Sequence, residues 1–530
     1  MKLESPPFTG LLDAARFEPR AYGLSVVATD FLGRCAHTEV PLYLDRVTDE
    51  GVTSVRTSAD GQVIAYTVFD GQRSNLRAAT VAGGRPRLVG MDVAADDYRM
   101  ADRGSRIAFI SAKEGRRALY LDVAPTPLFI AEGVQRFVLS PDGSTVAYVR
   151  MDGHDIVLRR LGTGAGVPVG SGAAVGVDDI AFVDDGRALA ALTRDRDGPS
   201  TLSVYDVKSG IERYRLARTR RFFVNEASRH LLVERGVRGG PRSMQSYPVE
   251  PGGSERGAIL ASGAEVSSVG LSSDARTFCF VVDGVFNAYR HTSLAGEPQP
   301  LLGSGAVKDV GAARLSPDGG RALTVSNQYD IGKAALVHWI FGQTGDATAE
   351  TLLVGDLHDF DLDQARFPSS GATLAYRHRG ELWVWDSAGR ARLLGAGVEA
   401  DVAFSPAVGG RLAFRQGAIG TGPVLKVYDV DEGEIEAVPA ALPVRSFSWS
   451  PTEVRLVTME APPDAANCGG PCRHIATSWF RHEGAFRGRL VSIRARSVGF
   501  SGDGAAVIAV GTSGTGETES GDTVVVTAPR

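Results

Sequence analysis

Short apolar strands alternate with polar turns along the chain, and one turn phrase recurs. Leu-Ser-Pro-Asp-Gly begins at Leu139 and is followed by the alternating stretch TVAYVR, and nearly the same phrase begins at Leu315. Asp and Gly supply the backbone conformations of tight turns, whereas β-branched and aromatic residues suit half-buried strands. Apolar spacings of three and four residues are scarce, so the pattern predicts an all-β chain with few helices.

Degenerate copies of this phrase recur with a mean period of about 44 residues, a range typical of solenoids and propellers. Each copy has a short apolar strand, a turn, a β-branched strand, a second turn, a third strand and a Gly-rich link, which predicts a four-stranded antiparallel blade. The residues in the place of the Ser are Ser58, Ala101, Ser140, Val183, Asn225, Ser272, Ser316, Pro368, Ser405, Ser450 and Ser501.

We expect these blades to be arranged radially, because closing a ring protects the sheet edges. A further copy near Glu18 brings the total to about twelve, more than the four to eight blades that one propeller usually holds. The expected architecture is therefore all-β tandem propellers, with six plus six blades favoured over five plus seven. On that arithmetic residues 1–265 form the first propeller and residues 266–530 the second.

The first 48 residues allow two interpretations. Residues 1–48 read as a degenerate blade or as the remnant of a truncated immunoglobulin-like domain, and the blade is favoured because a partial sandwich could not close its own core. Residues 1–12 could also add an outer strand to a late blade. The segment has no apolar stretch or cleavage site typical of a secretory signal.

The composition is that of an ordinary globular protein. Of the 530 residues, 43% are hydrophobic and 22% charged, with a formal net charge of -5. Nothing in this balance indicates a nucleic-acid partner, and no apolar run is long enough for a membrane span. We expect a monomer that needs no cofactor.

The repeat resembles the TolB-like, or WD40-like Pro-Asp, β-propeller repeat, most clearly at Ser140–Gly143 and Ser316–Gly319. Such repeats occur in envelope interaction proteins, in the propeller domains of dipeptidyl-peptidase-like hydrolases and in some polysaccharide lyases. The resemblance therefore implies a fold and leaves the function open.

Catalytic motifs are absent from the sequence. No G-x-S-x-G nucleophile elbow occurs, and the nearest stretch, GTSGTG at Gly511, reads as a hairpin loop. The nine histidines are scattered rather than set at metal-ligand spacings. This favours a protein that is not an enzyme.

The stretch NCGGPCRH holds two of the four cysteines. Cys468 and Cys472 could form a small disulfide in an oxidising compartment, which is the favoured interpretation, or remain free thiols. With His474 and His482 they could alternatively bind zinc.

Two acidic stretches, TRDRDGPS from Thr193 and HDFDLDQ from His358, suggest calcium ligands. The favoured interpretations are a hairpin turn for the first and a solvated strand face for Asp359, Asp361 and Asp363, which alternate along one strand. No metal site is therefore predicted.

Charged residues recur on the strands expected to line the central tunnel. They could present a polar mouth to a peptide tail or a carboxylated ligand, although pairing between adjacent blades is the favoured interpretation. The candidate ligand-binding residues are Asp97, Arg136, Asp179, Arg221, Asp363 and Asp401. A second set, two residues before the repeat anchors, is Arg16, Arg56, Arg99, Arg314 and Arg366.

The resemblance to TolB-like repeats, together with the lack of catalytic motifs, implies a non-catalytic interaction or scaffold module of the bacterial cell envelope that docks a protein or peptide at its tunnel mouths. The alternative is a carbohydrate-active, lyase-type or ligand-binding propeller enzyme. A periplasmic or cell-surface location requires a longer N-terminus than this one, and otherwise the chain is expected in the cytoplasm.

Overall fold

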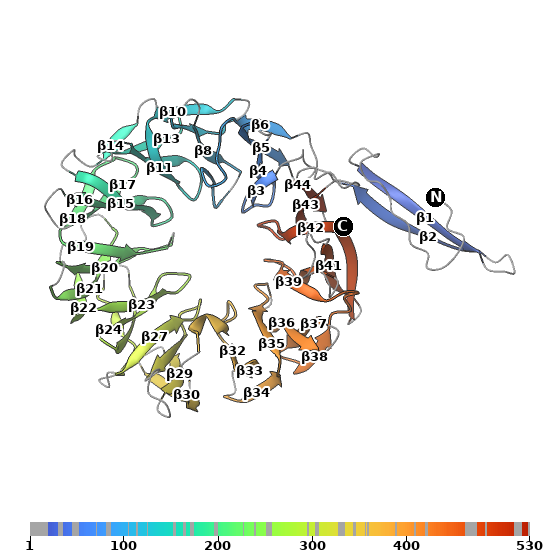
Figure 1. The fold of residues 1–530 in the computed structure, drawn as a ribbon. Coiled ribbons are helices and arrows are strands. Elements are labelled where there is room, and N and C mark those ends of the chain that lie inside the picture. The colour runs from blue at the N-terminus through green and yellow to red at the C-terminus, as the bar shows by residue number, and fades with distance from the viewer. Residues whose placement is uncertain are drawn as a thin grey trace.

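The computed structural model of the chain is a single ring of β-sheets around a central channel (Figure 1). The structure describes residues 20–527 apart from 30–34, 45–51, 70–71, 81–85, 104, 113–114, 124–125, 152–154, 163–165, 170–173, 196–199, 226, 238–239, 251–256, 294–295, 303–306, 327–333, 343–345, 356, 358–359, 387–388, 408–409, 419–421, 462–473, 483–484 and 513–521. Ten sheets form the ring, and the strands of each sheet are antiparallel neighbours in chain order. The molecule is therefore a ten-bladed propeller.

Blades 1 to 5 occupy the first half of the ring, and each has four strands. Blade 1 contains β3 (Val52–Thr57), β4 (Val63–Phe69), β5 (Ser74–Thr80) and β6 (Arg87–Gly90). Blade 2 contains β7 (Tyr98–Met100), β8 (Ile107–Ser111), β9 (Ala118–Leu121) and β10 (Leu128–Glu132). Blade 3 contains β11 (Val134–Leu139), β12 (Thr145–Arg150), β13 (Ile156–Arg160) and β14 (Val167–Val169). Blade 4 contains β15 (Ala174–Val183), β16 (Ala188–Asp195), β17 (Thr201–Asp206) and β18 (Glu212–Leu216). Blade 5 contains β19 (Thr219–Phe223), β20 (His230–Gly236), β21 (Arg242–Pro248) and β22 (Ala258–Gly263).

Blades 6 to 9 continue the ring with the same order of strands. Blade 6 contains β23 (Val266–Leu271), β24 (Thr277–Val282), β25 (Val285–Arg290) and β26 (Gln299–Pro300). Blade 7 contains β27 (Val310–Leu315), β28 (Arg321–Ser326), β29 (Ala334–Phe341) and β30 (Ala347–Gly355). The 3-10 helix η3 (Leu362–Gln364) leads into blade 8, which contains β31 (Ala365–Arg366), β32 (Leu374–His378), β33 (Glu381–Trp385) and β34 (Ala391–Gly395). Blade 9 contains β35 (Val398–Phe404), β36 (Arg411–Ala418), β37 (Gly422–Asp429) and β38 (Glu434–Ala437).

Blade 10 differs from the others because it has six strands. They are β39 (Val444–Trp449), β40 (Arg455–Glu460), β41 (His474–His482), β42 (Ala485–Phe500), β43 (Val507–Thr512) and β44 (Asp522–Thr527). The first part of β42 pairs with β41, and its last part, Ala495–Phe500, pairs with β43. The outermost strand of the repeat unit at Ser450 thus continues directly into the innermost strand of the unit at Ser501.

The structure has one ring where two rings of six blades were expected. Two of the twelve expected units do not form separate blades. The units at Ser450 and Ser501 share blade 10, and the segment around Glu18 leads into a two-stranded sheet, β1 (Arg20–Thr29) with β2 (Cys35–Leu44), rather than a four-stranded blade or a sandwich. Residues 1–12, considered above as an added outer strand, lie outside the described residues.

The ring closes by packing its last strands on its first blade. Ala506 and Ile508, at and next to β43, share an apolar cluster with Val52, Ile64 and Tyr66 of blade 1. The predicted boundary between residues 265 and 266 falls at the joint of blades 5 and 6, where Leu232 and Met244 pack with Val266 and Phe278. Packing of facing sheets, which the repeat period does not reveal, therefore determines the number of rings.

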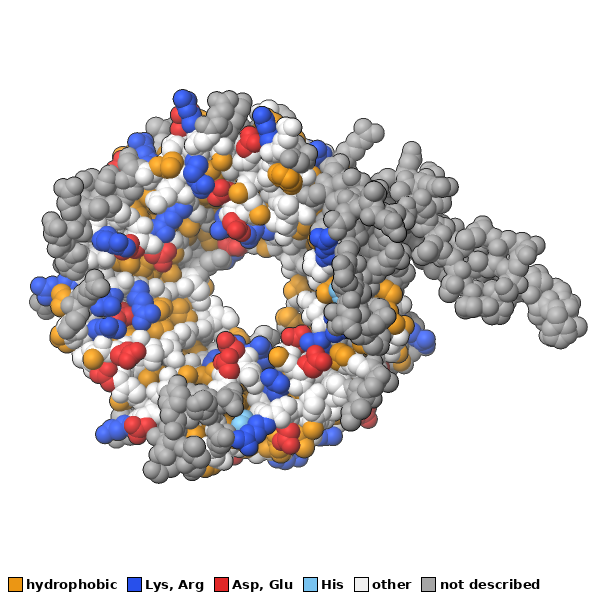
Figure 2. All heavy atoms as spheres, in the orientation of Figure 1, with side chains coloured by type: hydrophobic (Ala, Val, Ile, Leu, Met, Phe, Trp, Pro, Cys, Tyr) orange, Lys and Arg blue, Asp and Glu red, His pale blue; other side chains and the backbone are white. Residues whose placement is uncertain are grey.

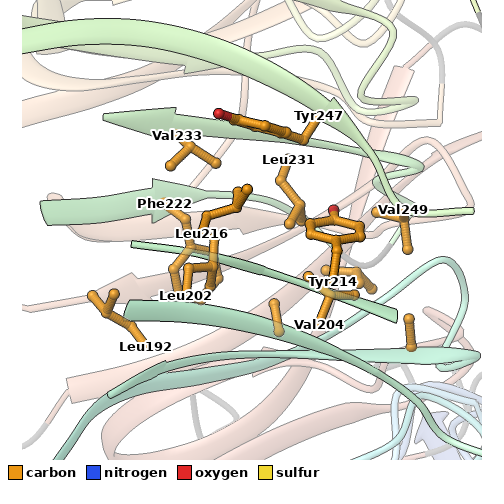
Figure 3. Close-up of a cluster of buried hydrophobic side chains, with 13 residues drawn as sticks. Leu192, Leu202, Val204, Tyr214, Leu216, Phe222, Leu231, Val233, Tyr247 and Val249 are labelled. Atoms are coloured by element: carbon orange, nitrogen blue, oxygen red, sulfur yellow. The ribbon is translucent and has the colours of Figure 1, made fainter. Parts of the chain in front are cut away.

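Apolar clusters between neighbouring sheets form the core. Figure 3 shows the cluster between blades 4 and 5, in which Leu202 and Val204 of one sheet face Leu231 and Val233 of the next. All four of these side chains are completely buried. Because each sheet buries both faces in this way, its strands read as nearly continuous apolar runs, and a side chain on either face contributes about 1.5–3 kcal/mol when buried.

The recurrent turn phrase forms the corner between the first and second strands of a blade. In the corner at Ser140, the Ser140 Oγ donates to Asp142 at 2.7 Å and accepts from the Thr145 N–H at 2.9 Å. Gly143 has φ of +68°, which suits glycine. Four other corners repeat the contact of the Ser Oγ with an N–H five residues later, at Ser58, Ser272, Ser316 and Ser501.

Corners also contact one another around one face of the ring. The Arg103 N–H of the second corner donates to the Pro141 carbonyl of the third at 2.7 Å. At the end of the ring, Thr452 Oγ1 donates to the Asp503 carbonyl at 2.6 Å. The phrase therefore links neighbouring units in addition to joining two strands within each unit.

Candidate functional site

The first strand of each blade lines the channel, and most of these strands carry a β-bulge near their start. The register shifts between Val52 and Ser54 in blade 1, and the same shift occurs near the start of β11, β15, β19, β27 and β39. A bulge adds one residue to the strand and re-aims the side chains beside it. The bulges thus place polar side chains at one rim of the channel, opposite the corners.

The two predicted tunnel arginines reach from one blade to the next. Arg136 donates to the carbonyls of Val177 at 2.7 Å and Asp178 at 3.0 Å in blade 4. Arg221 donates to the Val266 carbonyl of blade 6 at 3.0 Å. Both side chains therefore satisfy backbone acceptors at the joints between blades, and a ligand-binding role for them remains a prediction.

Three of the four predicted tunnel acids form ion pairs. Asp97 pairs with Arg117 at 3.0 Å, Asp401 with Arg415 at 2.7 Å, and Asp363 with Arg314 at 3.2 Å. The fourth, Asp179, is exposed, and its Oδ1 accepts the N–H of Ile180 at 2.9 Å. The structure does not gather these acids at one point, since each lies on its own blade.

Sequence reasoning did not identify a recess in the channel wall as one site, although it named two of its residues. The recess has a volume of about 590 Å³ and lies where the ring closes, between β3, β7 and β42. Arg56 and Arg99 contribute the positive charges and Asp102 a negative one. The signal that was available is the spacing of these two arginines, each of which lies two residues before a corner.

Both arginines of this recess lack a carboxylate partner among the residues that the structure describes. The Arg56 guanidinium lies over the Tyr98 ring, 5.2 Å from its centroid. Arg99 donates to the carbonyls of Asp96 and Tyr98, each at 2.9 Å. Burial raises the pKa of Tyr98, so the neutral phenol is maintained beneath Arg56. The recess can therefore offer two guanidinium groups to an anionic ligand.

A second concentration of positive charge lies on blade 5. Figure 2 shows Lys and Arg side chains gathered over β19 to β21. Arg220, Arg221 and Arg242 all approach the carboxylate of Glu234, at 3.4, 2.5 and 3.4 Å. Glu234 is 1% exposed, whereas Arg221 is half exposed. Only Arg221 of this group was identified from the sequence.

A smaller recess of about 270 Å³ lies between blades 9 and 10. Arg481 lies there within 4 Å of Asp429, Glu432 and Glu436. Burial opposes ionisation of Asp429, but hydrogen bonds from Arg411 and nearby backbone N–H groups outweigh it and lower the pKa of this carboxyl. The recess therefore combines paired charges that stabilise one another.

Two histidines that are distant in sequence meet at the joint of blades 5 and 6. His230 and His291 stack, and the His291 Nε2 lies 3.0 Å from the Ser246 Oγ. His291 and Ser246 are 5% and 4% exposed, so no substrate reaches this Ser-His pair. Their arrangement is a buried packing contact.

The other candidate groups contribute little to a site. Cys468 and Cys472 lie outside the described residues, as do residues 196–199 of the stretch from Thr193. Cys279 is buried, which raises the pKa of its thiol to about 12. In the second acidic stretch, Asp361 caps η3 by accepting the Asp363 N–H at 2.8 Å.

Within the described ranges, no group of three or more His, Cys, Asp or Glu side chains could hold a metal ion. The same part of the chain contains no helix that is long and apolar enough to cross a membrane.

Comparisons with known proteins bear on the fold alone. No family model matches the chain, and no curated protein matches it. A structure of a eukaryotic initiation factor is 14% identical, covers 74% of this chain and 97% of that one, and has a TM-score of 0.40. Dipeptidyl peptidase 4 of Porphyromonas gingivalis is 15% identical, covers 81% and 66%, and has a TM-score of 0.36. The tricorn protease is 13% identical, covers 89% and 57%, and has a TM-score of 0.22. The propeller assignment therefore rests on the strand topology of the chain itself.

Proposed function

We propose that this protein is a non-catalytic docking module that holds a protein or peptide partner at the mouth of its channel. The observation that carries the proposal is the recess at ring closure, where Arg56 and Arg99 lack carboxylate partners among the described side chains. Guanidinium groups that are not neutralised attract carboxylates and bind them through paired hydrogen bonds. The partner is therefore expected to carry an anionic group into the channel.

The form of the recess supports a macromolecular partner. Its walls come from three separate strands and include the exposed corner residues Ala59 and Asp102, so it opens onto the channel rather than into the core. An extended peptide fits such a wall because the strand backbones and short side chains of the recess, such as Ala59 and Gly499, allow the peptide to approach closely. Polar groups then fix its orientation.

The TolB-like resemblance extends this proposal to the bacterial cell envelope. Repeats of this kind occur in envelope interaction proteins, and the envelope location rests on that resemblance. Fractionation of the native host, followed by intact-mass measurement of the isolated chain, tests it. Recovery from the periplasm or cell surface supports the location, and recovery from the cytoplasm contradicts it.

Site-specific photo-crosslinking in the native host tests the docking site. A photoreactive residue in place of Ala59, in the recess, is compared with one in place of Ile259, which is 68% exposed on β22. We expect a defined protein adduct from position 59 alone, and its loss in the double variant R56Q/R99Q. Equal adducts from both positions, or an adduct that survives the double variant, would contradict the proposal. Substrate turnover by the purified chain would contradict its non-catalytic part.

A further inference from the structure

The carboxylate of Glu234 is buried at a place where several other blades hold an apolar side chain. Glu234 pairs across the sheet with Arg221, the residue that follows the bulge of β19. The equivalent positions of blades 3, 4, 7 and 10 hold Val149, Leu192, Val325 and Met459. Blade 1 holds the buried Thr67 at this position, and blade 5 differs from all five of these blades by placing a buried carboxylate there.

The bulge brings two consecutive arginines to the same carboxylate. Thr219 pairs with Arg235 and Arg221 with Glu234, so Arg220 is the inserted residue. On a regular strand, consecutive side chains point to opposite faces. Here Arg220 and Arg221 both reach Glu234, and Arg242 reaches it from β21. Three guanidinium charges around one carboxylate leave two that this carboxylate does not neutralise.

The balance of charge around this centre is positive. Hydrogen bonds from the N–H groups of Ala264 and Glu265, with a smaller contribution from Arg242, lower the pKa of Asp283, so this exposed acid is ionised and offsets part of the charge. Among the described residues near this end of blade 5, the acids Glu234, Glu265 and Asp283 are outnumbered by five arginines, an excess of two positive charges. The arginines are Arg218, Arg220, Arg221, Arg235 and Arg242.

These guanidinium groups are accessible from solvent. The side chains of Arg220, Arg221 and Arg242 are 32%, 50% and 25% exposed, whereas Glu234 is buried beneath them. The Arg221 guanidinium is further fixed by the Val266 carbonyl and the Phe223 ring. Such fixed guanidinium groups lose little freedom when they bind a second carboxylate.

We propose that this arginine cluster, Arg220, Arg221 and Arg242 around Glu234, binds an acidic segment of a partner protein through at least two of its side-chain carboxylates. The inference rests on the proposed docking function and assigns it a second contact, on the rim of the channel opposite the corners. Glu234 acts as a positioning residue, because it holds the three arginines in one layer while an exposed carboxylate from the partner binds above them.

Fluorescence anisotropy with a labelled hexaglutamate peptide tests the cluster, with hexaglutamine as the control peptide. The variant is R220Q, which leaves Arg221 and Arg242 to pair Glu234, and the control variant is R103Q, whose residue is 67% exposed and lies in a corner on the opposite rim. We expect R220Q to weaken hexaglutamate binding about three- to tenfold and R103Q to leave it unchanged. Urea unfolding of both variants confirms that their folds are intact, and R220E, which reverses the charge, should weaken binding further.

Three results would overturn the inference. They are equal affinity for hexaglutamine, no effect of R220Q and R220E, or displacement of the peptide by millimolar inorganic phosphate at constant ionic strength, which indicates a small-anion site. If R56Q/R99Q weakens hexaglutamate binding and R220Q does not, the closure recess is the acidic-peptide site and only the present inference fails. If R220Q weakens binding while position 59 gives no adduct, the proposed docking at the recess fails.

Discussion

His230 and His291 stack face to face, with ring centroids 3.6 Å apart and planes 10° from parallel. They come from neighbouring blades, since His230 begins β20 and His291 directly follows β25. Two imidazolium ions cannot occupy this geometry without strong repulsion. The joint between blades 5 and 6 therefore depends on at least one neutral ring.

We predict that the protein loses stability as the pH falls below about 6.5, the ordinary pKa of histidine. Burial, with a contribution from His230, lowers the pKa of His291 to about 3. The unfolded chain therefore binds a proton near pH 6.5, whereas the folded chain takes it up only near pH 3. The stability that the neutral His291 ring contributes above pH 6.5 is lost as the pH falls from 6.5 to 3. At about pH 5 the loss from His291 amounts to about 1–2 kcal/mol. Urea unfolding at pH 7.5 and at pH 5 measures this loss of stability.

The variant H291Q separates this effect from other titrations. Glutamine keeps a hydrogen-bonding group near Ser246 and does not titrate. The loss of stability between pH 7.5 and pH 5 should be smaller in H291Q, although His338, whose pKa burial lowers to about 4, keeps part of it. An identical loss in the variant and the natural chain would show that the stacked pair is not responsible.

The corner serines should contribute to stability individually. Ser272 is fully buried, donates to Asp274 at 2.6 Å and accepts the Thr277 N–H at 2.9 Å. S272A leaves that N–H without its partner and should lower the free energy of unfolding by about 1–3 kcal/mol. The adjacent Ser273 is exposed, so S273A should change it by less than about 0.5 kcal/mol. Chemical denaturation of both variants gives the comparison, and equal effects would contradict it.

Ring closure should be sensitive to a single methyl group at Gly61. This residue has φ of +67°, and a Cβ there would overlap the Asp503 carboxylate of blade 10. Gly162 has φ of +79° and no atom near the position of its Cβ. G162A should cost about 1 kcal/mol for backbone strain, and G61A more, because it adds the clash. Similar unfolding midpoints for the two variants would show that the Asp503 side chain moves away from the new methyl group without loss of stability.

Arg136 should behave as a structural residue. Its guanidinium donates to two carbonyls of blade 4, so R136M removes both hydrogen bonds and should destabilise the chain by about 1–3 kcal/mol. The control is R194M, because Arg194 is 64% exposed and pairs with Asp178 at the surface. Its effect should be below about 1 kcal/mol. If R136M leaves the unfolding midpoint unchanged, the residue is available for a ligand instead.

Local structure was largely predictable from the sequence, because it depends on neighbours along the chain. Asp-Gly corners and alternating strands gave four-stranded antiparallel blades in nine of the ten sheets that form the ring. Ring size was not predictable in this way. Ring size depends on the packing of Ile508 against the cluster of Ile64, which is distant in sequence. It also depends on β42, which runs as one strand where the repeat pattern suggested two separate units.

The candidate sites show the same division. Arg56 and Arg99 were identified by their position before a corner, but their meeting at ring closure follows from the circular arrangement. Glu234 gave no signal, because one acid in a strand reads as a solvent-facing residue until the bulge at Arg220 is known. Pairing between adjacent blades was the favoured interpretation of the tunnel acids, and Asp363 pairs in this way with Arg314, whereas Asp97 and Asp401 pair with arginines of their own blades.

The long strand β42 makes one part of the ring mechanically distinct. Separate sheets meet mainly through side-chain contacts, whereas β42 joins two repeat units by backbone pairing along both parts of its length, with register shifts near the middle of the strand. Slow amide hydrogen exchange is therefore expected to run from β41 across β42 into β43 without a break. We expect this segment to resist deformation beside the closure recess, so that thermal widening of the channel would occur on the opposite side of the ring.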